Sequence, residues 1–190
     1  MGRRSSINGL LTTPPVLEGK KTRLRPKRFS DVFNDYLWRS DSELCHLDAT
    51  YPITSSLEEF IGLYTQGQND SQNALRFAIE VLDGKHIGNF GYFNIDERKN
   101  EAELGIMIGD KSYWDKNYGV DVINTAVAYI FTNTDMKRIY LKTLDWNIRA
   151  QKCFIKCGFI TYGKLRRGEY SFALMEMFRY SYNGLSVKKD

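Results

Sequence analysis

The sequence has few of the side chains that build metal centres and disulfide frameworks. Its 190 residues include two histidines, His46 and His86, and three cysteines. Their scattered positions do not match the ligand spacing of a zinc site. An odd number of cysteines also excludes a framework in which every cysteine forms an intramolecular disulfide. We therefore expect no metal, and reduced thiols rather than a redox pair at Cys45, Cys153 and Cys157.

Long apolar runs are also missing. No stretch approaches the about 18 residues that a membrane-spanning helix needs, and the N-terminus lacks the apolar core of a secretory signal. The net charge is only +4, from 27 basic and 23 acidic residues, which gives little support for a nucleic-acid partner. The sequence thus predicts a cytoplasmic protein with neither a membrane nor a nucleic acid as its partner.

The composition favours one well-packed domain. Hydrophobic residues make up 42% of the chain and aromatic residues 14%, and a length of 190 residues suits a single domain. The consecutive prolines Pro14 and Pro15 mark a break before the first strand. We expect a flexible N-terminal tail over residues 1–14, a single domain over 15–180 and a C-terminal tail over 181–190.

Hydrophobic periodicity predicts a mixed α/β fold. Ser56 and Glu59 form a capping box at the start of one helix, and the turn at Asp83-Gly84 joins two strands of an antiparallel meander. A loop is expected around residues 45–55. The expected strands are 16–26, 74–82, 86–95, 102–109, 137–144, 159–165 and 170–178, and the expected helices are 29–39, 56–66, 120–133 and 147–157.

One short stretch, YWDKNYGVDV at residues 113–122, places a glycine at the start of a helix. After Gly119, the residues Val120, Ile123 and Val127 follow the helical spacing of three and four. Free backbone N–H groups and the positive end of the helix dipole favour an anion at such a position. We therefore expect an anionic ligand there.

A second motif, NIRAQKCFIKCGF, covers residues 147–159. Asn147 can cap the helix, and Gly158 can end it before the next strand. Ala150, Cys153 and Phe154 fall on one helix face with Cys157. Each position has a structural explanation, but the combination is more informative than its parts.

Together the two motifs resemble those of the GNAT superfamily of acetyltransferases, and most closely its branch of ribosomal-protein N-terminal and related amine acetyltransferases. The resemblance follows the order of elements over about residues 16–178, and only the two motifs are specific. It implies a GNAT-like central mixed, largely antiparallel sheet with a splayed central strand pair and helices on both faces.

The resemblance also implies a reaction, in which acetyl-CoA donates an acetyl group to a primary amine that attacks it directly in a ternary complex. Glu103 would be the general base, since strand alternation places it on the same face as Met107, with Glu101 in reserve. The cofactor-binding residues would be Ile106, Met107, Ile108, Lys116, Asn117, Tyr118, Gly119, Val120, Asn147 and Phe154.

Three residues depart from the family pattern. Asn117 replaces the first glycine of the loop, and asparagine tolerates a positive φ. Asp115 places a negative charge near the expected diphosphate, which Lys116 is expected to offset. Phe154 stands where many members have a tyrosine that protonates the departing thiolate. Other hydroxyl groups that could serve belong to Tyr113, Tyr118 and Tyr170.

Several alternatives stay open at this stage. The chain could be a non-catalytic acyl-CoA-binding regulatory module of the same fold, or could bind ribosomal components through its basic residues 20–28. The acceptor could be a protein N-terminus, a polyamine, an aminoglycoside, an amino sugar or an amino acid. Glu43, His46, Asp48 and Tyr51 could bind its amine. The chain could be a monomer or a homodimer, and the final strand pair would suit a dimer interface.

Overall fold

The computed structural model describes residues 14–67 and 74–182. The predicted N-terminal tail lies outside the described residues except for Pro14, and the predicted C-terminal tail does so except for residues 181 and 182. These two residues continue a helical turn that begins at Arg179.

The described chain forms one eight-stranded sheet in the order β1-β2-β3-β4-β5-β6-β8-β7. Every neighbouring pair is antiparallel except β5 and β6, which run parallel. The predicted mixed α/β fold with a largely antiparallel sheet is therefore confirmed. The strands are β1 (Leu17–Glu18), β2 (Thr22–Pro26), β3 (Leu75–Val81), β4 (His86–Asp96), β5 (Glu101–Ile108), β6 (Arg138–Leu144), β7 (Ile160–Arg167) and β8 (Tyr170–Phe178).

The helices include one that the sequence did not predict. Residues Ser42–Leu47 form the helix α3, so the expected loop at 45–55 was wrong at its start. Asp41 caps α3 by accepting a hydrogen bond from the Leu44 N–H at 2.9 Å. A helix of six residues is too short to show a clear period. The other elements are η1 (Phe29–Asp31), α2 (Val32–Ser40), α4 (Leu57–Gly67), η2 (Lys111–Tyr113), α5 (Tyr118–Asn133) and α6 (Ile148–Lys156).

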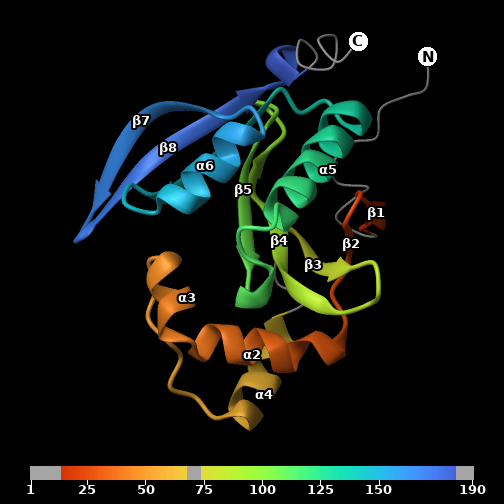
Figure 1. Ribbon diagram of the computed structural model, residues 1–190, viewed down its shortest axis with the longest axis vertical. Coiled ribbons are helices and arrows are strands. Elements are labelled where there is room, and N and C mark those ends of the chain that lie inside the picture. Colours follow the sequence, from red (N-terminus) through yellow and green to blue (C-terminus); the bar gives the residue numbers. More distant parts are fainter. Residues whose placement is uncertain (1–13, 68–73, 183–190) are drawn as a thin grey trace.

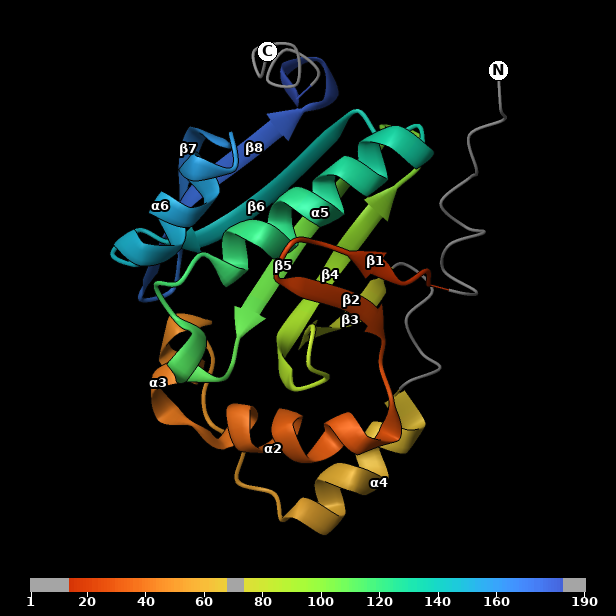
Figure 2. The same cartoon turned by 45° about the vertical axis from the view of Figure 1, so that its right-hand side comes forward.

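The helices lie against both faces of the sheet. On one face, α5 buries Ile123, Val127 and Ile130 in the main hydrophobic core, and α6 lies beside α5 (Figure 2). On the other face, Asp35 of α2 accepts a hydrogen bond at 2.7 Å from Asn89 of β4. Asn89 precedes the core residue Phe90, so its side chain points to the opposite face of the sheet. The helices α2, α3 and α4 gather at the end of the sheet toward which β5 runs (Figure 1).

The sheet opens between its two central strands. β5 and β6 pair only at Glu101–Arg138, Ala102–Ile139 and Glu103–Tyr140. Beyond Glu103, β5 continues to Ile108 on its pairing with β4, while β6 continues on its pairing with β8. The remaining edge of β5 therefore faces an opening instead of a strand, which is the splayed pair that the sequence predicted.

Candidate active site

A cleft of about 740 Å³ begins at this opening. It is lined by residues of α3, β4, β5 and β6, by the segment that leads into α5, and by the start of α6. Nine of the ten predicted cofactor-binding residues line it, and the predicted base Glu103 does too. The fold thus brings two distant sequence motifs to one cavity.

Two loop residues before α5 that differ from the family pattern both have a left-handed backbone conformation. Asn117, the residue before the helix, has φ of 62°, and Asp115 has φ of 56°. Asparagine and aspartate adopt this left-handed region more readily than most residues. The side-chain oxygen of Asn117 also accepts a hydrogen bond at 2.7 Å from the ammonium group of Lys156 on α6. The expectation that asparagine supports a positive φ here is borne out.

A carboxylate in the first turn of α5 fixes this end of the helix to the N-terminal strands. Asp121 accepts hydrogen bonds from the backbone N–H groups of Lys20, Lys21 and Thr22 at 2.9 to 3.0 Å, and from the Thr22 hydroxyl at 2.7 Å. A Cβ atom on Gly19 would lie only 2.4 Å from Asp121 Oδ2. Glycine is therefore required in the β1–β2 turn for this contact.

The basic residues of this N-terminal region are mostly paired within the protein. Arg25 binds Asp31 through two hydrogen bonds of 2.8 Å and also contacts Glu80. Lys27 pairs with Asp35 at 2.7 Å. Because buried ion pairs occupy these side chains, they are not available to a nucleic acid, and the RNA-binding alternative loses much of its support.

The half of the cleft at the N-terminus of α5 is called the helix-mouth half below. Basic side chains that were not predicted from the sequence line it. Arg149, Lys152 and Lys156 all come from α6 and line the cavity, whereas the predicted Lys116 does not. The Lys116 ammonium instead donates to the Ser112 carbonyl oxygen at 2.8 Å. Spacings of three and four along α6 could have revealed the three cations as one helix face.

Arg149 is held over an aromatic ring at the edge of this half. Its guanidinium carbon lies 3.5 Å from the centre of the Trp114 ring. The indole N–H of Trp114 donates to the Ile108 carbonyl oxygen at 2.7 Å. A cation that stacks on a fixed indole keeps its N–H groups free at the ring edge for a ligand.

Glu103 lies in the other half, where both of its carboxylate oxygens are bonded. Lys142 of β6 contacts one oxygen at 2.5 Å, and the Asn94 amide donates to the other at 2.7 Å. The side chain is 14% exposed. The reserve candidate, Glu101, pairs instead with Arg138 at 2.7 Å and does not line the cleft.

Aromatic residues divide into core and cleft groups. Phe154 is 6% exposed, and its ring packs against Phe159 at 5.9 Å while still lining the cleft. Tyr113 and Tyr118 line it too, with ring centres 4.9 Å apart, whereas Tyr170 does not. Of the three tyrosines considered as proton donors, two are therefore near the expected thioester path.

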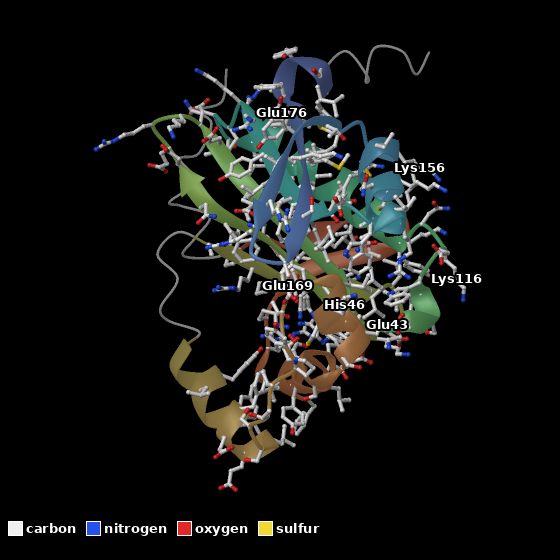
Figure 3. The ribbon with its side chains drawn as sticks, turned by 90° about the vertical axis from the view of Figure 1, so that its left-hand side faces the viewer. Glu43, His46, Lys116, Lys156, Glu169 and Glu176 are labelled. Atoms are coloured by element: carbon white, nitrogen blue, oxygen red, sulfur yellow. The ribbon has the colours of Figure 1, made fainter. Side chains whose placement is uncertain are left out.

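The β7–β8 hairpin contacts the segment that follows α3, and Phe172 of β8 lines the cleft. The Tyr51 hydroxyl donates to Glu169, at the tip of that hairpin, at 3.0 Å. His46 of α3 stacks on Trp146 with ring centres 4.7 Å apart. Figure 3 shows Glu169 and His46 near each other, with Glu43 between His46 and Lys116 and with Lys156 farther away.

Asp48 is the least engaged carboxylate in this half. It follows α3 and lines the cleft. Its nearest cation is Arg39, at 3.9 Å, and its side chain is 64% exposed. The protein that surrounds it in the concave cleft raises its pKa, although Arg39 and Lys142 oppose this effect. Asp48 can therefore accept a hydrogen bond from an incoming ligand without losing an internal one.

Comparison with known proteins identifies the family. Residues 21–160 match the family described as "Acetyltransferase (GNAT) domain". The chain therefore belongs to the GNAT acetyltransferase family, as its motifs indicated. It is an N-acetyltransferase, with acetyl-CoA as its cosubstrate. Its placement in the ribosomal-protein branch stays a prediction.

Named relatives support the class. An uncharacterized N-acetyltransferase, YoaA, of Bacillus subtilis is 24% identical over 163 residues, which cover 82% of this chain and 89% of that protein. Spermidine N(1)-acetyltransferase of Vibrio cholerae is 29% identical over 110 residues, 58% of this chain and 62% of that protein.

Solved structures share the fold. Spermidine N-acetyltransferase from Vibrio cholerae, in complex with CoA and spermine, has a TM-score of 0.75 at 23% identity, over 85% of this chain and 98% of that one. The aminoglycoside acetyltransferase AAC(6')-Ib, in complex with coenzyme A, has a TM-score of 0.73 at 16% identity, over 87% of this chain and 99% of that one.

Within residues 14–67 and 74–182, no helix combines the length and the apolar character of a membrane span. The same residues contain no group of three or more histidine, cysteine, aspartate or glutamate side chains placed to hold a metal ion.

Proposed function

We propose that this protein transfers the acetyl group of acetyl-CoA to a primary amine that attacks the thioester directly in a ternary complex. The observation that carries the proposal is the continuity of one cleft. It runs from the N-terminus of α5, along the unpaired edge of β5, to Glu103 and Asp48. One end has the chemistry for an anion and the other end has the chemistry for an amine.

The helix-mouth half suits the anionic part of acetyl-CoA. The backbone N–H groups at Tyr118, Gly119 and Val120 begin α5 and have no partner within the helix, which makes them donors to a diphosphate. Arg149 and Lys156 add positive charge to the lining. The free edge of β5 at Ile106 to Ile108 would then receive the pantetheine amides, as an added strand does.

Glu103 is the proposed proton acceptor. An amine must lose a proton to attack a thioester and form a stable amide, so a carboxylate within reach of the acceptor, directly or through a water, promotes the step. The bonds from Lys142 and Asn94 hold the Glu103 carboxylate in one orientation. Phe154 cannot protonate the leaving thiolate, so we assign that role to Tyr113 or Tyr118, which line the same cleft.

The acceptor is proposed to enter beside α3 and the β7–β8 hairpin. Asp48 would bind its ammonium group before the proton is lost. Spermidine is the first acceptor to test, because the name of a relative includes it. A peptide with a free N-terminus tests the ribosomal-protein branch. An aminoglycoside tests the class of acceptor that the name of the structural neighbour AAC(6')-Ib gives.

The test joins calorimetric titration with acetyl-CoA to an assay of amine-dependent CoA release. We expect Glu103→Gln to reduce kcat about 100-fold or more, as loss of a general base does, with the acetyl-CoA affinity unchanged. Glu101→Gln is the matched control, because that carboxylate lies on the same strand but outside the cleft, and we expect its kcat to stay near wild type.

The outcomes separate this proposal from a regulatory module. Acetyl-CoA binding without amine-dependent CoA release, across all three acceptor classes, would favour a non-catalytic acyl-CoA-binding protein. Equal losses in the Glu103 and Glu101 variants would contradict the role of Glu103 as proton acceptor.

A further inference from the structure

Two cysteines of α6 lie where that helix contacts the start of α5. Cys153 is half-buried and lines the cleft. Its Sγ atom would lie 3.3 Å from a Cβ atom on Gly119. Cys157 is buried, and its thiol donates to the Val120 carbonyl oxygen at 3.8 Å. Of the three thiols, Cys153 is therefore the one that lines the helix-mouth half of the cleft.

The surroundings of Cys153 favour its thiolate. The neighbouring Cys157 thiol lowers the pKa of Cys153, against the effect of burial, and Lys156 lowers it further. The neighbouring Cys153 and burial raise the pKa of Cys157 far above its ordinary value, so Cys157 keeps its proton, which it donates to the Val120 carbonyl oxygen. The nearby N-terminus of α5 adds partial positive charge. A thiolate in such surroundings is the reactive form of cysteine.

The positive charge of the helix-mouth half favours anionic molecules as reagents for Cys153. Arg149, Lys152 and Lys156 line it, and Asp115 is the acidic side chain among its lining residues. An anionic molecule is therefore attracted to the thiol. Cys45 offers a contrast within the same chain, because it is 2% exposed and its thiol donates to the Arg39 carbonyl oxygen at 3.2 Å.

We propose that Cys153 is a site of reversible modification by anionic low-molecular-weight disulfides, and that the adduct blocks the acetyl-CoA groove. The proposal rests on the groove assigned under the proposed function. The Cys153 thiolate attacks one sulfur of the disulfide, a new S–S bond forms at Cys153, and the other half leaves as a thiolate.

The closeness of Gly119 explains why an adduct would block the groove. A Cβ atom on Gly119 would lie only 3.3 Å from Cys153 Sγ, so there is little space between the two helices for a group attached to this sulfur. Such a group must extend into the cleft, where the diphosphate of acetyl-CoA is expected. A second thiol can reverse the modification by the same exchange.

The test treats reduced full-length protein with glutathione disulfide. Peptide mapping by mass spectrometry locates the adduct, and calorimetric titration measures acetyl-CoA affinity before treatment, after it, and after reduction with dithiothreitol. We expect one glutathione on Cys153, none on Cys45, at least a ten-fold loss of affinity, and recovery on reduction. We also expect excess acetyl-CoA to slow formation of the adduct.

Variants distinguish the site from general thiol chemistry. Cys153→Ser should give the same acetyl-CoA affinity before and after treatment, whereas Cys45→Ser should remain as sensitive as wild type. If Cys153→Ser does not fold, Cys153→Ala makes the same comparison.

Two results would overturn the inference. One is modification of Cys45 in preference to Cys153, and the other is an adduct on Cys153 with unchanged acetyl-CoA affinity. Failure of the proposed function has a different signature, because the untreated reduced protein would then not bind acetyl-CoA at all. The mass readout of Cys153 against Cys45 does not depend on that binding.

Discussion

At the scale of single residues, the cleft contains two carboxylates with different surroundings. Glu103 has a bonded partner for each oxygen and is little exposed, whereas Asp48 forms only a long ion pair with Arg39, at 3.9 Å. A fully bonded carboxylate has a fixed orientation, which suits proton transfer. A carboxylate with free lone pairs can receive the ammonium group of a substrate. The two residues therefore have different expected effects on kinetics.

Replacing Asp48 tests the second of these roles. We expect Asp48→Asn to raise KM for the amine about 10- to 100-fold, the range for loss of a hydrogen bond to a charged group, with little change in acetyl-CoA affinity. Steady-state kinetics and calorimetric titration measure the two quantities. Glu43→Gln is the control, because Glu43 pairs with Lys111 outside the cleft lining. An equal rise of KM in both variants would contradict the assignment.

At the scale of elements, the start of α5 depends on one residue with a positive φ. Asn117 has φ of 62° directly before the helix. A β-branched residue there would clash with the backbone, and the left-handed conformation costs about 1–2 kcal/mol for a residue with a Cβ atom. Glycine adopts the same conformation without that cost.

The pair Asn117→Val and Asn117→Gly separates the backbone effect from loss of the Asn117–Lys156 bond, which both variants lose. We expect the valine variant to have a free energy of unfolding lower than that of the glycine variant by about 1–2 kcal/mol. Urea unfolding followed by circular dichroism measures the difference. Equal stabilities would show that the helix start does not require the left-handed conformation.

At the scale of the whole molecule, a buried ionic cluster joins β2, η1 and β3. Arg25, Asp31 and Glu80 are each at most 4% exposed. Burial alone raises the pKa of Asp31, but hydrogen bonds from the Arg25 guanidinium and the Arg28 backbone N–H outweigh it, so the pKa lies below its ordinary value of 3.8. The ionised carboxylate therefore stabilises the fold.

This cluster predicts a loss of stability in acid. Above about pH 5 the Asp31 carboxylate is ionised in both folded and unfolded chains, and its stabilisation is fully present. As the pH falls further, the unfolded chain takes up the proton first, so the stabilisation is lost. We expect Asp31→Asn to lower the free energy of unfolding by about 3–5 kcal/mol at pH 7, and by less at pH 3. Urea unfolding at both pH values tests this, and a constant difference would contradict it.

The edge of the sheet bears on oligomeric state. β7 is an outer strand, and its apolar residues Ile160, Tyr162 and Leu165 are 60%, 44% and 42% exposed. An apolar edge strand of this kind favours pairing with another chain. Of the two states that the sequence left open, we therefore expect the homodimer, formed through β7.

Light scattering coupled to size-exclusion chromatography tests the dimer. We expect Leu165→Lys to shift the mass toward the monomer. Leu63→Lys should leave the mass unchanged, because Leu63 is a 63% exposed leucine on α4, away from the edge strand. A monomeric wild-type protein would contradict the expectation.

Features that depend on neighbours a few residues apart were predictable from the sequence. The Ser56–Glu59 capping box forms, with bonds of 2.8 and 3.2 Å. Asn147 caps α6 by accepting from the Ala150 N–H at 3.2 Å. The strands and longer helices also follow their periods, because local spacing decides which face of an element is apolar. The short helix α3 escaped prediction because it contains too few residues for a period.

The sequence by itself therefore determined the strands and the longer helices, the two motifs and the family that they indicate. Only the tertiary structure placed Lys142 on Glu103, and only it placed the cations of α6 in the cleft in preference to Lys116. It also joined Asp121 to residues 20–22, about 100 positions away. Such contacts depend on the order of the strands in the sheet and on where β5 separates from β6. Local periodicity carries no information about either, because it reports only which side of an element is buried.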